Sequence, residues 1–573
     1  MHTPVYDRYR RAFAEGLAAA LNMSFEEVEP QVKPAEAAHG DLSFATFPLA
    51  KAQRKAPPAI ASAIASQLQV QGLVVSAVGP YVNARFAAAP FTAEVLGTVK
   101  EQGAAYGQST AGEGRTVLVE YSSPNIAKPI GFHHIRTTMI GHAVANLYRS
   151  QGYKVVSLNY LGDWGKQFGL VAVGFKEYGD PARRDDVTHL VEVYVKANAR
   201  AEQDPVFDAE ARAFFRKMED GDAEALALWK GFRDASLENF KKVYRRLGIH
   251  YDSYEGESDY RGARMDAVVD EVTRTVGTRI SEGALIVDVP YADNEPPVLL
   301  RKSDGTTLYV TRDLAAAEDR YARYHFHRSL YVVAQDQALH LRQVFGVLGR
   351  MSKAWAQDCV HVSFGRVHGM STRKGKVVML EDVLDEAKSR ALEKVSENQK
   401  VGRIQTDDAE ALAEQIGLGA LVFGDLKNRR ATDYTFDWDE VLNFDGHTGP
   451  YLQYAHARAC NLLKRGGGAP EQFDPALLAL PEEQALVRVV ATFPKTVREA
   501  REQHEPSLVS RHLLELAAAF SRWYTLGNQD REKRVLVEGD DPTRAARLVL
   551  ADAVRVTLSA GLELLGITAP QSM

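Results

Sequence analysis

The stretch from Glu120 to Arg136 gathers an unusual set of chemically active side chains within one short segment. It contains asparagine, lysine, two prolines and the adjacent pair His133 and His134. Val117 to Val119 precede it as an apolar, β-branched run, and apolar residues at helical spacing follow it until Gly152. The pattern predicts a loop between a strand and a helix, where free backbone N–H groups bind anions such as phosphate. On these residues alone, two histidines that cap a helix remain an alternative.

Length and composition predict a soluble protein of several domains. The chain has 573 residues, of which 45% are hydrophobic and 25% charged, values ordinary for globular proteins. The two cysteines, Cys359 and Cys460, argue against a disulfide framework or a cysteine-built zinc site, and we expect no protein-bound metal. No apolar run approaches the roughly 20 residues of a membrane-spanning helix. The first residues lack a signal-peptide layout, so we expect a cytoplasmic protein.

The net charge of −6 excludes a uniformly basic protein, so a nucleic-acid partner would need a local basic surface. Three clusters could supply one: Lys427 to Arg430, Lys464 with Arg465, and Lys241 to Arg246. From composition alone, each is more simply explained as a solvated helix face.

The pattern of apolar residues divides the chain into three parts. Residues 1–110 predict a small α+β domain with a strand pair at Val74 to Phe86. Residues 111–385 alternate strands and helices, which predicts a Rossmann-like α/β domain whose mostly parallel sheet is covered on both faces. A charge-rich helical insertion interrupts this part at about 175–265. Residues 386–573 predict an all-α bundle.

Within the middle part, several elements are predicted individually. Leu285 to Val289 and Pro297 to Arg301 have the composition of strands of this sheet. Asp304 and Gly305 predict a hairpin turn, and a helix is expected from Asp313 to Tyr324.

Five blocks of sequence are distinctive: Glu-Tyr-Ser-Ser-Pro-Asn-Ile-Ala-Lys-Pro at 120–129, Asn-Tyr-Leu-Gly-Asp-Trp-Gly-Lys-Gln-Phe-Gly at 159–169, Asp-Gly-Thr-Thr-Leu-Tyr-Val-Thr-Arg-Asp at 304–313, Gly-Met-Ser-Thr-Arg-Lys-Gly at 369–375 and Gly-Pro-Tyr-Leu-Gln-Tyr-Ala-His-Ala-Arg at 449–458. In this order they resemble the arginyl-tRNA synthetases, a family of class I synthetases. The resemblance implies ATP-dependent activation of L-arginine, with Mg²⁺ accompanying ATP, and transfer of arginine to the 3′ end of its tRNA. It also implies a monomer that activates arginine only with tRNA bound. The N-terminal domain would then contact the tRNA elbow, and the helical bundle would bind the anticodon.

The resemblance assigns the catalytic residues to two signatures. The first signature (131–134) reads Gly-Phe-His-His, where the family usually has His-Ile-Gly-His. Gly131 thus replaces the usual first histidine, and we hypothesise that His133 swings out or partly substitutes for it. The second signature (369–374) lacks the second lysine of the usual Lys-Met-Ser-Lys-Ser, and Lys128 is the family's substitute. The implied catalytic residues are Lys128, His133, His134, Arg373 and Lys374, and the implied ATP-binding residues are Pro129, Gly131, His134, Gly162, Asp163, Met370 and Ser371.

The substrate guanidinium presents five N–H donors, which carboxylates satisfy best. The resemblance places two acids in the arginine pocket, and the full implied set is Glu120, Ser122, Asn125, Tyr309, Asp313 and Gln337. Tyr309 precedes Asp313 by four residues, so both face one way if this run is the first turn of a helix. From local sequence alone, Asp313 fits a helix N-cap equally.

Aromatic residues of the helical bundle are candidates for contacts to tRNA, because unpaired bases stack on aromatic rings. The candidates are Tyr451, Tyr454, Arg458, Trp523 and Met573. Packing in the core of the bundle remains the alternative for each.

Two rival functions stay open. One is a tRNA-binding paralogue with impaired catalysis, which the altered residues Gly131 and His133 suggest. The other is a synthetase for another amino acid, which Glu120 and Asp313 disfavour, because a neutral substrate would leave two buried carboxylates unpaired.

Overall fold

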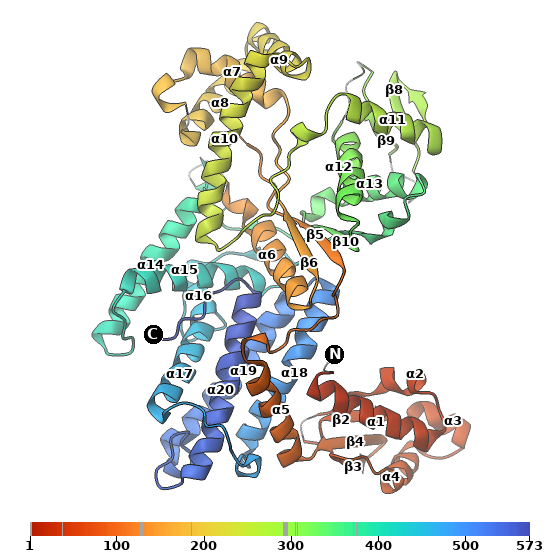
Figure 1. Cartoon of the computed structure of the whole chain (residues 1–573), viewed down its shortest axis with the longest axis vertical. Coiled ribbons are helices and arrows are strands. Elements are labelled where there is room, and N and C mark those ends of the chain that lie inside the picture. Colours follow the sequence, from red (N-terminus) through yellow and green to blue (C-terminus); the bar gives the residue numbers. More distant parts are fainter. Residues whose placement is uncertain are drawn as a thin grey trace.

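The computed structural model describes residues 3–573 apart from 37, 127–129, 185, 290–295, 304, 306–307, 371 and 374–375, and at 372–373 and 376–377 it describes the backbone alone. Figure 1 shows a small sheet near the middle of the molecule, with two lobes above it and a helical bundle below it. The N-terminal part lies beside the bundle. Among the described helices, none has the length and apolar character needed to cross a bilayer.

The middle of the molecule is a four-stranded parallel sheet in the order β11-β10-β5-β6. Its strands are β5 (Thr116–Glu120), β6 (Lys154–Leu158), β10 (Arg328–Tyr331) and β11 (Cys359–His361). Successive side chains of a strand point to opposite faces. Accordingly, Val117 and Val119 pack in the core that includes α6 (Ile135–Ser150), whereas Leu118 packs with α12 (Tyr309–Tyr324) and α13 (Ala338–Arg350). The predicted parallel sheet with two covered faces is therefore confirmed.

A second, antiparallel sheet lies apart from this one, in the lobe above it to the right in Figure 1. Its strands are β7 (Arg279–Ser281), β8 (Ala284–Val287) and β9 (Val298–Arg301), and α11 (Ala263–Thr275) precedes them. The prediction that β8 and β9 belong to the parallel sheet was wrong. Glu282 and Gly283, both with positive φ, join β7 to β8 in a two-residue turn, and such a turn forces antiparallel pairing.

The segment after β9 also differs from its prediction. The chain enters α12 at Tyr309, and the described residues between β9 and this helix form no second strand of the hairpin predicted at Asp304 and Gly305. Gly305 still sits in a turn, because its N–H donates to the Lys302 carbonyl at 2.9 Å, while Asp304 lies outside the described residues. The helix begins four residues before the expected Asp313, which places Tyr309 and Asp313 on one face, as the four-residue spacing predicts.

The second lobe above the sheet consists of four helices, α7 (Lys166–Tyr178), α8 (Val187–Ala201), α9 (Pro205–Glu219) and α10 (Ala223–Arg246). Three successive helices begin after an aspartate, Asp186, Asp204 and Asp222, whose side chain accepts backbone N–H groups of the first turn. Such caps stabilise a helix start by about 1 kcal/mol each. The long helix α10 returns the chain from this lobe to the sheet (Figure 1).

The N-terminal part is an α+β unit built on an antiparallel sheet in the order β1-β2-β4-β3. Its elements are α1 (Val5–Leu21), α2 (Phe25–Val28), β1 (Lys33–Pro34), β2 (Leu42–Ala45), α3 (Ala50–Gln53), α4 (Pro57–Gln67), β3 (Leu73–Val78) and β4 (Tyr81–Phe86). The strands β3 and β4 are the predicted strand pair. Helix α5 (Ala88–Gln102) then leads to the central sheet.

The last part of the chain is almost entirely helical. Its helices are α14 (Leu380–Lys400), α15 (Ala409–Leu426), α16 (Trp438–Val441), α17 (Gly449–Gly466), α18 (Pro481–Gln503), α19 (Ser507–Gln529) and α20 (Asp541–Leu564). Short two-residue strands β12 (Val367–His368) and β15 (Tyr434–Thr435) pair between the sheet and the bundle, and β13 (Thr372–Arg373) pairs with β14 (Lys376–Val377). A buried ion pair, Arg136 on α6 with Asp425 on α15 at 2.9 Å, joins the central domain to the bundle.

Candidate active site

The loop that follows β5 is held in a strained conformation. Ser122 and Ser123 have φ values of 70° and 44°, in the left-handed region that costs a non-glycine residue about 1–3 kcal/mol. The Ser122 N–H donates to Thr137 Oγ1 at 3.0 Å, and its hydroxyl lies 2.8 Å from the Tyr244 hydroxyl. Contacts from α6 and α10 therefore fix the loop, and the buried Ser122 holds the backbone in place.

Asn125 and Gly162 lie side by side although 37 positions separate them. They form a parallel bridge, and the Ile126 N–H donates to the Gly162 carbonyl at 3.2 Å. A Cβ atom at Gly162 would stand 1.9 Å from Asn125 Oδ1, so a larger residue would displace the Asn125 side chain from this position. Asn125 remains exposed, so its side chain is accessible at the rim of the loop.

The region of the first signature is tied to the segment that follows the second one. The Phe132 N–H donates to the Val378 carbonyl and the Leu380 N–H to the Ile130 carbonyl, both at 2.8 Å. Gly131 forms an antiparallel bridge with Met379 between these two bonds. The two signatures, far apart in sequence, are thus brought to one place.

Several predicted residues of this region lie outside the described residues, namely Lys128, Pro129, Ser371 and Lys374. At Arg373 the structure gives the backbone alone, in the antiparallel pair of β13 and β14. Met370 is half-buried against the hydrophobic core.

The two signature histidines differ in their surroundings. Burial, with a contribution from His133, lowers the pKa of His134 to about 3, so its imidazole is neutral at pH 7. Its Nδ1 is buried without a hydrogen-bond partner among the described residues. His133 is exposed, with its ring centroid 4.1 Å from that of His134. His134 can thus exchange hydrogen bonds with a ligand, but it does not supply a positive charge.

The carboxylate of Glu120, at the carboxyl end of β5, is already paired with a guanidinium of the protein. Arg320 on α12 contacts Glu120 Oε2 through Nη1 at 2.5 Å and Glu255 through Nε at 3.3 Å. Burial raises the pKa of Glu120, Arg320 opposes that rise, and nearby Asp313 adds to it. The Arg320 guanidinium also lies over the Tyr160 ring, 4.9 Å from its centroid.

Asp313 stands where α12 and α13 begin. Its Oδ2 lies 2.5 Å from Nε2 of His340 on α13, and both side chains are about one quarter exposed (25% and 26%). Tyr309, one turn earlier on α12, is exposed, and so is Gln337, three residues before His340. The structure therefore brings Tyr309, Asp313 and Gln337 to the starts of two neighbouring helices.

A third carboxyl group belongs to the same site. Burial raises the pKa of Glu257 to about 8, against the effect of Arg312, whose Nη1 lies 3.3 Å away. The charges of Asp313 and Asp163 raise this pKa further. We call Glu120, Glu257 and Asp313 the acidic cluster. Three acids at the carboxyl edge of a parallel sheet, where ligands of such sheets bind, make a site for a cation.

Sequence reasoning missed Glu257, His340 and Arg320, because none of them lies in the five distinctive blocks. Arg320 had a signal, since it follows Asp313 by seven residues on the same face of α12. For Glu257 and His340 no local pattern exists.

The side chain of Asp163 is buried and hydrogen-bonded to other protein groups. Its buried carboxylate accepts hydrogen bonds at 2.8 Å from Arg233 Nε and from both the N–H and the hydroxyl of Ser258. It thereby joins α10 to the loop that carries Glu257. A contact of Asp163 with ATP stays a prediction.

The candidate tRNA contacts fall into two groups. Tyr451, Tyr454 and Arg458 are half-buried on α17, and Arg458 lies over the Tyr454 ring, 4.7 Å from its centroid. Trp523 is fully buried, and Met573 is 5% exposed. A base could reach Trp523 only after the bundle rearranged, so among these residues α17 offers the accessible surface.

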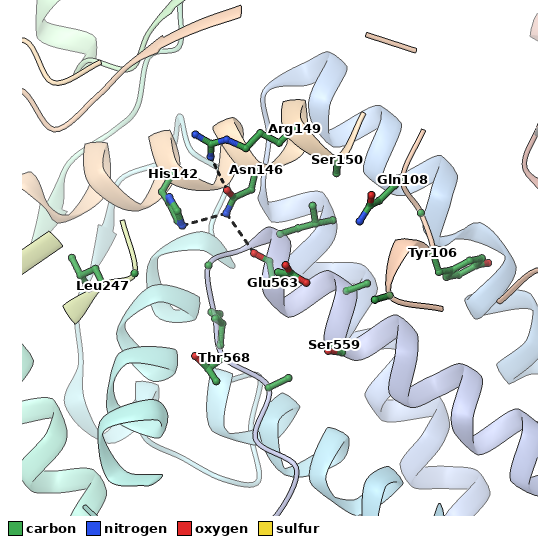
Figure 2. A pocket seen from close by; sticks show the side chains of 18 residues that line it. Tyr106, Gln108, His142, Asn146, Arg149, Ser150, Leu247, Ser559, Glu563 and Thr568 are labelled. Carbon is green, nitrogen blue, oxygen red and sulfur yellow. Dashed lines mark hydrogen bonds between the residues drawn. The ribbon is translucent and has the colours of Figure 1, made fainter. Parts of the chain in front are cut away.

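A cavity of about 620 Å³ lies away from the acidic cluster, between α6, α20 and the segment after α5 (Figure 2). On α6, the Asn146 side-chain amide donates to His142 Nε2 at 3.2 Å and to the Glu563 carbonyl at 3.4 Å. None of the predicted site residues lines this cavity. Helix α6 therefore follows His134 at its start and contacts the C-terminal helix α20 through its second half.

In the described part of the chain, no group of three or more histidine, cysteine, aspartate or glutamate side chains is arranged to hold a metal ion.

This fold and site are those of a class I tRNA synthetase. Residues 96–438 match the family model of the catalytic domain of class I tRNA synthetases (R). Residues 7–86 match the arginyl tRNA synthetase N-terminal domain, and residues 452–573 match the DALR anticodon-binding domain.

The chain belongs to the arginyl-tRNA synthetase family. It is 41% identical over 575 residues to an arginine–tRNA ligase of Ligilactobacillus salivarius, covering 99% of this chain and 100% of the relative. An arginine–tRNA ligase of Streptococcus equi is 42% identical, covering 93% and 94%. The Thermus thermophilus arginyl-tRNA synthetase has a similar structure, with a TM-score of 0.81 at 26% identity, covering 98% and 100%.

Proposed function

We propose that this protein is an arginine–tRNA ligase that activates L-arginine with ATP, supplied as its Mg²⁺ complex, and transfers it to the 3′ end of its tRNA. The observation that carries the proposal is the acidic cluster beside the two joined signatures. A guanidinium needs several hydrogen-bond acceptors of negative charge, and a buried cluster of carboxyl groups is the site most selective for it.

The chemistry needs positioning rather than a nucleophilic side chain. The arginine carboxylate attacks the α-phosphorus of ATP, and pyrophosphate leaves. The ribose hydroxyl of the tRNA 3′ end then takes the arginyl group from AMP. Aligning the reactants and placing hydrogen-bond donors at the phosphates accounts for most of such catalysis. The neutral His134 imidazole carries one N–H, which is suited to donate to a phosphate oxygen without adding a positive charge.

The two rival functions have less support. A neutral amino acid would bring no positive charge to the Asp313 carboxylate in a partly buried site, which disfavours a synthetase of other specificity. The impaired paralogue would explain Gly131 and His133, but not the full-length similarity to arginine–tRNA ligases.

The test is charging of total tRNA with labelled arginine, ATP and Mg²⁺ by the wild type, by His134→Ala and by His325→Asn. His325 ends α12 on the surface in a left-handed conformation that asparagine accepts, so it serves as the matched histidine control. We expect the wild type and the control to charge tRNA and His134→Ala to be slower by orders of magnitude. No charging by folded wild type that still binds tRNA would overturn the proposal in favour of the paralogue.

We also propose that arginine activation depends on bound tRNA, whose anticodon contacts Tyr451, Tyr454 and Arg458, and that the enzyme acts as a cytoplasmic monomer. Arginine-dependent exchange of pyrophosphate into ATP, measured with and without tRNA, tests the first point. Exchange at equal rates in both cases would refute it. Light scattering of the purified protein tests the oligomeric state.

A further inference from the structure

The donor and the acceptor of the hydrogen bond between His340 and Asp313 can be assigned. A carboxylate oxygen can only accept a hydrogen bond, so Nε2 of His340 carries the proton in the 2.5 Å contact with Asp313 Oδ2. This contact joins the second turn of α12 to the first turn of α13. It therefore fixes both a side chain and the relative position of two helix starts.

The other charged groups near Asp313 do not offer it an equivalent partner. Arg320 pairs with Glu120 and Glu255, and Arg312 pairs with Glu257. The remaining members of the acidic cluster are themselves carboxyl groups and supply no positive charge to Asp313. Without a donor of its own, this carboxylate would be free to turn away from the cluster.

We propose that His340 is a positioning residue, which holds the Asp313 carboxylate in the orientation that receives the guanidinium of arginine. The inference rests on the proposed function and adds to it a residue that is not part of the five distinctive blocks. His340 acts through Asp313 and does not itself touch the substrate.

The residue type suits this role. Lysine or arginine at this position would carry a full positive charge, which would neutralise Asp313 and compete with the substrate. An imidazole donates one directed hydrogen bond through Nε2 and leaves the lone pairs of the second carboxylate oxygen to the guanidinium. The contact occupies Oδ2 of Asp313, and within the described part of the chain no side chain forms a hydrogen bond or ion pair with Oδ1.

The experiment compares His340→Ala with His340→Gln in the full-length enzyme. Both replacements are good helix formers, so α13 is retained. The amide nitrogen of glutamine can take the place of Nε2, whereas alanine donates nothing. We expect His340→Ala to raise the KM for arginine about tenfold or more, because a directed hydrogen bond to a charged group is lost. The KM for ATP should stay within about twofold, and His340→Gln should restore most of the arginine KM. His325→Asn, on the same helix as Asp313, is the control and should match the wild type.

A double-mutant cycle with Asp313→Asn tests whether His340 changes the KM for arginine through Asp313. If His340 acts through Asp313, removing its side chain in the Asp313→Asn background changes the arginine KM little further. Additive effects, or a His340→Gln variant as impaired as His340→Ala, would overturn the inference. Wild-type charging of tRNA in the same assay distinguishes that outcome from failure of the proposed function, which predicts no charging with arginine at all.

Discussion

Arginine binding should release a proton from Glu257. Its carboxyl group has a pKa of about 8 in the unliganded protein, chiefly because it is buried. A guanidinium placed beside the acidic cluster favours the ionised carboxylate and lowers that pKa. Since the site binds arginine best when Glu257 is ionised, protonation competes with arginine.

The size of the effect follows from the ionised fraction. With a pKa of about 8, roughly 1% of Glu257 is ionised at pH 6, about 9% at pH 7 and about half at pH 8. The apparent dissociation constant is the intrinsic one divided by this fraction. The affinity for arginine should therefore rise about 50-fold from pH 6 to pH 8, which is about 2.3 kcal/mol.

Calorimetric titration with arginine at pH 6, 7 and 8, in two buffers of different ionisation enthalpy, measures both the affinity and the protons released. About 0.9 proton per arginine is expected at pH 7. Glu257→Gln cannot titrate, so its affinity should be nearly constant over this range. An equally steep pH dependence in Glu257→Gln, or a flat one in the wild type, would refute the reasoning.

The same pKa shift affects stability with a definite sign. Between pH 4.5 and about 8 the folded protein holds a proton on Glu257 that the unfolded chain has lost. The contribution of this group to stability is therefore full below pH 4.5, and it is lost as the pH rises through about 8.

Three further outcomes are expected. Arg136→Met should destabilise the protein by about 3–5 kcal/mol in thermal unfolding, because it leaves Asp425 buried and unpaired, and replacing both residues by apolar ones should recover most of this loss; equal effects of the single and double changes would contradict it. Gly141→Ala should destabilise the protein by about 1–3 kcal/mol, because a Cβ there lies 2.2 Å from a tyrosine ring. Gly97→Ala, with nothing within 4 Å of its Cβ, should stabilise the protein by up to about 1 kcal/mol. The free energies of unfolding of the two variants, measured in urea, should therefore change in opposite directions. Tyr244→Phe should raise the KM for arginine in the charging assay by loosening the loop after β5, and an unchanged KM would show that the loop needs no such support.

The sequence predicted those elements whose own pattern decides their structure. β5 and α6 combine an apolar run, a helical period and a terminating glycine, and their bounds agree with expectation within a few residues. β8 and β9 are short apolar runs, and nothing in a short run specifies whether its partner is parallel or antiparallel. The start of α12 was missed because Val310 and Thr311 are β-branched; in the fold, Thr311 donates to the Leu300 carbonyl at 2.9 Å, a contact made by tertiary structure.

Candidate site residues could be nominated from the sequence where they lie in contiguous blocks, whereas contacts that depend on long-range packing could not. Glu120 and Asp313 were identified by resemblance, but their partners Arg320 and His340 were not. An arginine inside a helix and a histidine at a helix start have many ordinary explanations. Only the folded chain shows that each contacts a carboxylate of the acidic cluster.

The pair of hydrogen bonds that joins Ile130 and Phe132 to Val378 and Leu380 also bears on the order of synthesis. The first signature leaves the ribosome about 250 residues before the segment that pairs with it, and at about 5–20 residues per second this interval lasts roughly 12–50 s. During that time β5, α6 and β6 can already pack, while the backbone N–H and C=O groups of the first signature are hydrogen-bonded to water. This pairing of the two signature regions is therefore completed late, when α14 emerges, and if the proposed ATP site requires it, a nascent chain stalled before that helix should bind no ATP.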